Sequence, residues 1–150
     1  MISLVVALIA VAVAVGSWFK PTPVPPTPPD ATTNFSDQQI SDAKAAVCAA
    51  HDLVNRATQT AGGQSSDDPT QKFVIAVNIR VGSIASAGYF LATLNQYPAT
   101  SNKLATAVRE TATAYQEATL LQIALAPKEE TDVAYAKLNA ADAKYVQACQ

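Results

Sequence analysis

The chain has 150 residues, enough for one ordinary domain with a single hydrophobic core. Charged residues make up only 15% of it, the net charge is −2, and lysines and arginines are scattered singly, which excludes an electrostatic footprint for nucleic acid or for anionic lipid. Much of the apolar content is alanine and valine, whose small side chains suit closely packed helices.

An uncharged apolar segment opens the chain. No side chain from Ile2 to Phe19 carries a charge, and as a helix this run would be about 27 Å long, close to the hydrocarbon thickness of a bilayer. Trp18 and Phe19 at its end fit the headgroup level. We therefore predict a transmembrane signal-anchor helix over residues 1–19, which contacts membrane lipid through residues 2–19. A cleaved secretory signal and a buried helix of a soluble core are the alternatives.

A proline-rich stretch follows the apolar segment. Pro21 to Pro29 contain six prolines, which fix φ and remove backbone donors, so this stretch is neither helix nor central strand. We predict an extended polyproline linker over residues 20–34, rising about 3.1 Å per residue and acting as a spacer. The remaining residues, 35–150, are predicted to form one helical domain on the extracytoplasmic side of the cell membrane.

The first helix of this domain has three agreeing start signals. Ser36 is a helix cap, Gln39 completes a capping box, and Phe35 and Ile40 occupy the hydrophobic-staple positions. Apolar residues then recur at alternating spacings of three and four to about Thr60, which predicts one inward face. The residues expected on that face are Ile40, Ala43, Val47, Ala50, Val54 and Ala57.

The second helix repeats this start chemistry. Asp68 is the cap, Pro69 occupies the first helical position, and Gln71 stands three residues after the cap. Residues 73–94 are apolar on more than one face, which predicts the most buried helix of the domain. Residues 77–81 alternate between apolar and polar, so a strand there is the alternative.

Small residues gather in the middle of this second helix. Gly82 and Gly88 should each cost the helix roughly 1 kcal/mol relative to alanine. Close approach of a neighbouring helix is the simpler explanation for them, and a ligand groove is the alternative. The candidate interaction or ligand face consists of Gly82, Ser86, Gly88, Tyr89, Phe90 and Tyr115.

Two more helices complete the domain. Pro98 breaks the chain, Thr100 to Asn102 offer caps, and the third helix is expected to run to about Ala126. Pro127 separates it from a fourth helix with an acidic first turn. Short connections between helices predict an all-α, up-down four-helix bundle. The inward residues expected are Leu104, Val108, Ala112, Tyr115 and Ala118 on the third helix, and Leu138, Ala141 or Asp142, Tyr145 and Cys149 on the fourth.

The chain has two cysteines, and they lie on helices that are neighbours in such a bundle. In an exported protein an even cysteine count favours a disulfide, so we predict the pair Cys48–Cys149. A metal site formed by these two residues with His51 is the alternative, although C-x-x-H alone is a weak signal. His51 itself is expected to be a partly exposed surface residue.

Catalytic motifs are missing from the sequence. It contains no G-x-S-x-G, no Walker loop and no H-E-x-x-H, so we expect no catalytic residue, no metal and no cofactor. Glu110 and Glu117 are seven residues apart and could form a carboxylate pair, but solvated surface charges are the simpler interpretation.

Several stretches together resemble a known group of proteins. These are the apolar start, the Pro/Thr-rich stalk, residues 35–44 and 46–50, and the terminal Ala148-Cys149-Gln150. In them the chain is similar to the alanine- and proline-rich single-pass membrane proteins of unknown function of mycobacteria and related actinomycetes. The resemblance implies a cell-envelope location and transfers no functional residue.

Two functions follow as hypotheses. The first is a non-enzymatic, membrane-tethered accessory subunit that contacts an envelope membrane protein. The second is a small-molecule or lipid-binding helical domain with its site between Gly82 and Tyr89, because ligand sites in bundles form between helices.

Overall fold

The structure is a computed structural model that describes residues 34–150. The predictions for the anchor (1–19) and for the linker (20–34, except Asn34) lie outside the described residues. Within them the chain forms four α-helices and no strand. The strand considered for residues 77–81 is therefore wrong. The helices are α2 (Asp37–Gly62), α3 (Pro69–Gln96), α4 (Asn102–Ile123) and α5 (Lys128–Cys149).

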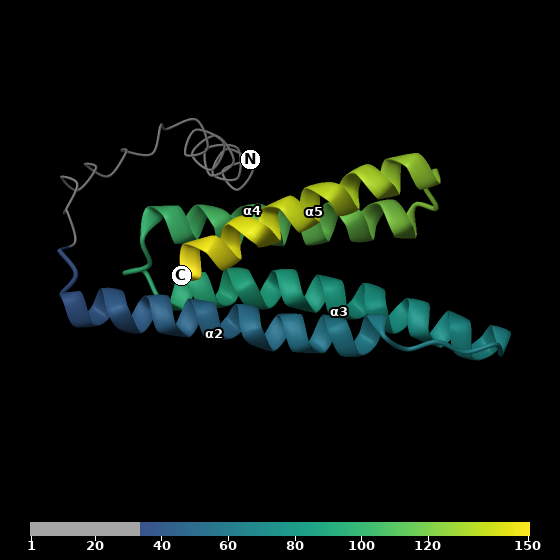
Figure 1. The fold of residues 1–150 in the computed structure, drawn as a ribbon, viewed down its shortest axis with the longest axis horizontal. Coiled ribbons are helices and arrows are strands. Elements are labelled where there is room, and N and C mark those ends of the chain that lie inside the picture. The colour runs from purple at the N-terminus through teal and green to yellow at the C-terminus, as the bar shows by residue number, and fades with distance from the viewer. Residues whose placement is uncertain (1–33) are drawn as a thin grey trace, which may run out of the picture. The chain divides into compact units, whose positions relative to one another are not determined.

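The helices form an up-down bundle in which each packs beside the next one in the chain (Figure 1). The α2–α3, α3–α4 and α4–α5 pairs share extensive contacts, whereas α2 and α5 touch far less. The compact unit spans Phe35–Gln150. The prediction of an all-helical domain with four helices is confirmed.

Helix starts follow the capping chemistry of the sequence. Ser36 Oγ accepts a bond from the Gln39 amide while the Gln39 side chain accepts one from the Ser36 amide, so the capping box is complete. Asp68 accepts a bond from the Gln71 amide at 2.8 Å. Ser101 caps α4. These local bonds satisfy amides that a helix start leaves without partners, which is why the starts could be predicted closely.

The turn between α4 and α5 begins earlier than expected. α4 ends at Ile123 rather than near Ala126, because Leu125 adopts φ 53°. The amide of Ala126 bonds to the Leu121 carbonyl, and that of Leu125 bonds to the Gln122 carbonyl. This is a Schellman motif with leucine where glycine is usual. Pro127 then prevents the helix from continuing.

The hydrophobic core is concentrated at one end of the bundle. Val47, Phe90, Leu104, Val108 and Tyr145 are almost completely buried there, and they come from all four helices. Two residues predicted to face inward on α2 are exposed, Ile40 and Ala57, because they lie beyond the ends of this core.

The predicted burial of α3 is wrong. Its buried residues all lie in its C-terminal half, from Ser86 to Leu94, and α4 has the most buried residues. The reason is geometric: α2 and α4 cover only one side of α3, so the apolar residues on its other side face solvent. These exposed residues, which we call the α3 ridge, are Phe73, Val74, Val77, Val81 and Ile84.

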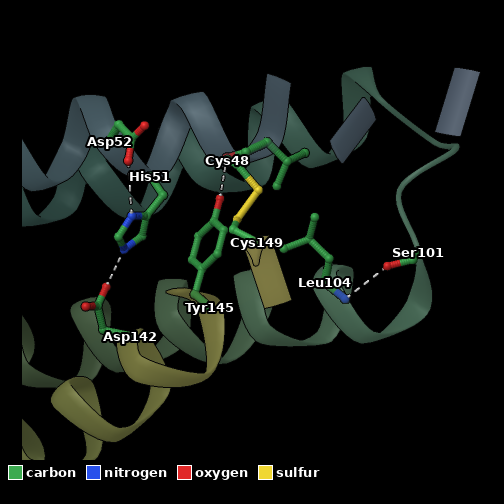
Figure 2. The surroundings of a disulfide bond; sticks show 9 residues. Cys48, His51, Asp52, Ser101, Leu104, Asp142, Tyr145 and Cys149 are labelled. Atoms are coloured by element: carbon green, nitrogen blue, oxygen red, sulfur yellow. Dashed lines mark hydrogen bonds and ion pairs between the residues drawn. A yellow bond between two sulfur atoms is a disulfide. The ribbon is translucent and has the colours of Figure 1, made fainter. Parts of the chain in front are cut away.

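The disulfide Cys48–Cys149 is present and joins α2 to α5, as predicted (Figure 2). The two residues are 101 positions apart in the chain, with Cα atoms 5.8 Å apart. Both cysteines pack against the core. The bond therefore closes a loop that includes nearly the whole domain.

Breaking this bond should destabilise the domain strongly. The chain-entropy model gives about 4.7 kcal/mol for a loop of about 100 residues. We expect the double variant Cys48→Ser/Cys149→Ser to lose about 3–5 kcal/mol of unfolding free energy, measured by urea denaturation. Equal denaturation midpoints for the variant and the oxidised chain, or two titratable thiols in the natively exported protein, would contradict the assignment.

Candidate functional site

A buried polar and aromatic cluster lies beside the disulfide. Tyr145 is fully buried, and its hydroxyl donates a hydrogen bond to the Val47 carbonyl at 2.7 Å. The ring of Tyr145 meets those of His51 and Phe90 edge-on, with centroids 4.8 and 5.2 Å away. Burial raises the pKa of Tyr145. The hydroxyl is therefore held as a neutral donor.

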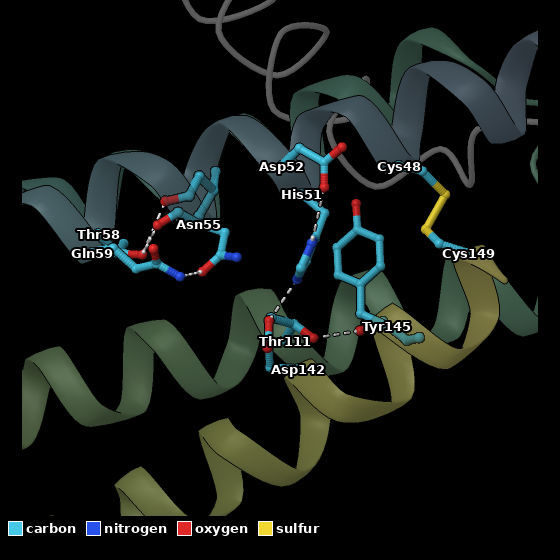
Figure 3. Close-up of polar contacts among 12 residues, drawn as sticks. Cys48, His51, Asp52, Asn55, Thr58, Gln59, Thr111, Asp142, Tyr145 and Cys149 are labelled. Carbon is cyan, nitrogen blue, oxygen red and sulfur yellow. Dashed lines mark hydrogen bonds and ion pairs between the residues drawn. A yellow bond between two sulfur atoms is a disulfide. The ribbon is translucent and has the colours of Figure 1, made fainter.

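His51 is only 7% exposed, so the prediction of a partly exposed histidine is wrong. Its Nε2 lies 2.8 Å from Asp142 Oδ1, and its Nδ1 lies 3.9 Å from Asp52 Oδ1 (Figure 3). The hydrogen bond to Asp142 raises the pKa of His51, although burial opposes this, and the charges of both aspartates add to the rise. The pair links α2 to α5.

Just beyond this cluster, away from the disulfide, a cavity of about 260 Å³ lies between the four helices. Gly82 and Ser86 from α3 and Tyr115 from α4 line it, so the structure brings three of the six predicted face residues together. Residues outside the predicted face complete its wall. They are Ala57, Thr58, Ala61, Ile79, Ser83, Tyr135, Leu138 and Asn139, of which only Ala57 and Leu138 were expected to face inward.

The other three predicted face residues lie elsewhere. Phe90 is buried in the core, whereas Gly88 and Tyr89 are exposed on α3. A Cβ atom at Gly82 or at Gly88 would meet nothing within 4 Å. Close approach of a neighbouring helix of this domain therefore does not account for either glycine, and only Gly82 borders a cavity.

A smaller, more polar cavity of about 190 Å³ adjoins the first. Thr58, Tyr115, Leu138 and Asn139 line both cavities, which makes them neighbouring chambers of one space. The other residues that line the smaller chamber are His51, Val54, Asn55 and Asp142. The His51–Asp142 pair is thus part of its wall.

The other constellations considered from the sequence take structural roles. Glu110 and Glu117 do line one surface groove, but each binds a lysine of α5, Lys144 at 2.7 Å and Lys137 at 2.8 Å. Cys48 and Cys149 are bonded to each other, so neither offers a thiolate to a metal beside His51. In the part of the chain that the structure describes, no three His, Cys, Asp or Glu side chains are grouped to hold a metal ion.

Among the described helices, α3 is the one that is long and apolar enough to cross a membrane by length and composition alone. A core helix of a soluble protein meets the same criterion. Phe90 and Leu94 pack its inner side into the bundle, which favours a bundle helix with one exposed apolar side.

Comparison with protein-family models, with curated proteins and with solved structures finds no significant match to the chain. Function must therefore be inferred from the arrangement of these residues.

The stability of the domain should depend on pH through His51. Because its folded pKa is raised above the ordinary value of 6.5, the pair's contribution is complete below about pH 6.5 and is lost as pH rises through the folded pKa. We expect the free energy of unfolding to fall by about 1 kcal/mol between pH 6 and pH 8.5, as for a charge-assisted hydrogen bond from a buried histidine to a partly exposed carboxylate.

Urea denaturation across this pH range measures the effect. Asp142→Asn should flatten the dependence, because a neutral amide lacks the negative charge that favours the charged form of the histidine. Asp132→Asn, on the same helix and paired with Lys128, is the matched control and should keep the slope of the parent protein. An unchanged slope in Asp142→Asn would contradict this assignment.

Proposed function

We propose that this protein is a non-catalytic accessory module of the cell envelope, tethered to the cell membrane by residues 1–19, whose α3 ridge binds an apolar helix of a membrane-protein partner. The observation that carries the proposal is the exposure of this ridge on a helix that is otherwise packed into a bundle. Phe73 is 66% exposed, Val81 60% and Ile84 51%. Contiguous apolar surface of this kind marks interaction sites.

The spacing of the ridge suits a partner helix. Val74, Val77, Val81 and Ile84 are separated by three, four and three residues, which is the periodicity of a helix–helix seam with knobs-into-holes packing. Gly88 continues the same spacing and is exposed. A glycine with open space above it would let a partner helix approach α3 closely, a role that no neighbour within this domain requires of it.

The charges on α3 agree with an apolar contact. Lys72 and Arg80 are its only charged residues, and it has no acidic residue. Each of the other three helices carries both acids and bases. A partner helix packing along the ridge would therefore bury few charges, which keeps the desolvation penalty of binding low.

Two observations support the envelope location. The disulfide is compatible with an oxidising, extracytoplasmic compartment. The uncharged N-terminal segment has the length of a membrane span. The resemblance to actinobacterial alanine- and proline-rich membrane proteins agrees with both. The polyproline stretch would then fix the distance of the domain from the bilayer.

Site-specific photo-crosslinking in cells that natively express the chain tests the ridge. A benzophenone side chain at Val81 should give a discrete adduct with a membrane protein, and adding Ile84→Lys should remove that adduct, because a lysine in the seam must be desolvated. Val133 on α5 is the matched control position, since it is apolar and 57% exposed.

Adducts of equal yield from Val81 and Val133, or none from either, would contradict a specific contact through α3. An adduct of twice the chain's own mass would show that α3 contacts a second copy of this protein, and this result would also contradict the proposal.

The location has its own test. Alkaline phosphatase fused after Gln150 should be active, because the enzyme forms its disulfides only outside the cytoplasm, and the fusion should stay in the membrane fraction after carbonate extraction. An inactive fusion would place the domain in the cytoplasm. An active fusion found in the soluble fraction would favour the cleaved-signal alternative.

A further inference from the structure

The cavity between the helices has the features of a ligand site that is separate from the α3 ridge. All four helices contribute to its wall, and Gly82 leaves its α3 side open because no side chain projects there. It lies in the half of the bundle away from the disulfide, where α2 contributes Ala57 and Ala61 rather than large core residues.

The larger chamber is apolar and uncharged. No Asp, Glu, Lys, Arg or His side chain lines it, and its aliphatic and aromatic wall includes Ile79, Leu138 and Tyr135. Both of its serine hydroxyls are already used as donors: Ser83 bonds to the Ile79 carbonyl at 2.9 Å and Ser86 to the Gly82 carbonyl at 2.7 Å. A charged group placed here would lose its hydration without gaining a partner.

The smaller chamber is polar, but its charges are paired with each other. His51 and Asp142 lie 2.8 Å apart, so the carboxylate is already engaged by the imidazole and is not free to pair with an ionic ligand. Asn55, Thr58 and Asn139 add amide and hydroxyl groups to the same wall. Such a wall offers hydrogen-bond donors and acceptors to hydroxyl groups.

We propose that the two chambers together bind a small neutral amphiphile, with an apolar chain in the chamber at Gly82 and a hydroxylated head group beside His51 and Asp142. Size supports this division. A water molecule takes about 30 Å³ in the liquid and a methylene is of similar size, so the 260 Å³ chamber holds roughly six to eight carbons. The 190 Å³ chamber accommodates a head group of about the size of one sugar ring or of glycerol.

Hexyl β-D-glucoside is the probe that matches both chambers. We would titrate it into the full, disulfide-intact chain in lipid nanodiscs, with empty nanodiscs as the blank, and follow binding by calorimetry. His51 is the only histidine of the chain, so its ring proton resonances report on the polar chamber without ambiguity. Saturable binding with a shift of these resonances is the expected result.

Two glycine variants of the same helix make a matched pair. A leucine side chain at position 82 would enter the apolar chamber, so Gly82→Leu should weaken binding at least 10-fold. Gly88→Leu adds the same side chain on the exposed side of α3 and should leave the affinity within about 2-fold. A Cβ atom meets nothing at either position, and circular dichroism of both variants confirms that the helices are retained.

The head group is tested separately. Asn139→Ala should weaken binding about 3- to 10-fold, because it removes an amide from the wall that both chambers share, and hexane itself should not shift the His51 resonances. Hexyl sulfate and hexyltrimethylammonium are the charged comparators and should bind at least 10-fold more weakly than the glucoside.

The proposal is overturned if the glucoside does not bind, if both glycine variants weaken it equally, or if either charged comparator binds more tightly. These outcomes are independent of the proposed partner contact. Gly82→Leu should leave the photo-adduct at Val81 intact, whereas Gly88→Leu should reduce that adduct and keep the glucoside site.

Discussion

Three links between α2 and α5 hold one end of this bundle closed, and the rest of the domain depends on them. They are the Cys48–Cys149 bond, the hydrogen bond from Tyr145 to the Val47 carbonyl, and the His51–Asp142 pair. On α2 they lie between Val47 and His51, and on α5 between Asp142 and Cys149. The two helices share few contacts overall, and residues of both line the cavity. The three links therefore hold the core together at one end of the bundle and leave a cavity beside it.

The two sides of α3 show how one sequence can serve two environments. Its inner side supplies Phe90 and Leu94 to the core and leaves a gap at Gly82. Its outer side carries the α3 ridge and the exposed Gly88. A helix that is apolar on all sides is predicted from sequence to be buried. In this domain the outer apolar side of α3 has no neighbour within the described residues. The excess of apolar surface is what the proposed partner contact would use.

Local chemistry explains what the sequence could predict. The caps at Ser36, Asp68 and Ser101 bond to backbone amides only three residues later in the chain. The starts of these three helices were therefore predicted correctly. The disulfide also followed, because two cysteines on neighbouring helices allow one pairing. Burial depends instead on which helices flank each face, and this misled the prediction for α3. The interior position of His51 depends on Asp142, which is 91 residues away.

A usable signal for that pair was nevertheless present. Once Cys48 and Cys149 are joined on antiparallel helices, His51 lies about one turn beyond the disulfide on α2 and Asp142 about two turns beyond it on α5. The offset along the axis is about 6 Å, which the two side chains bridge. Tyr145 lies between these levels. The cavity was predicted only in part. The small residues of α3 pointed to Gly82 and Ser86, whereas the contributions of α2 and α5 depend on how these helices pack against α3.

The closure at one end has a mechanical consequence. Helices that are fixed together at one end swing about that end, and the amplitude of the swing grows with distance from it. The chamber at Gly82 lies away from the linked end, where small side chains such as Ala57 and Ala61 make little contact between helices. A ligand of the proposed site would enter and leave where the helices separate, while the edge-on packing of Tyr145 against His51 and Phe90 holds the closed end together.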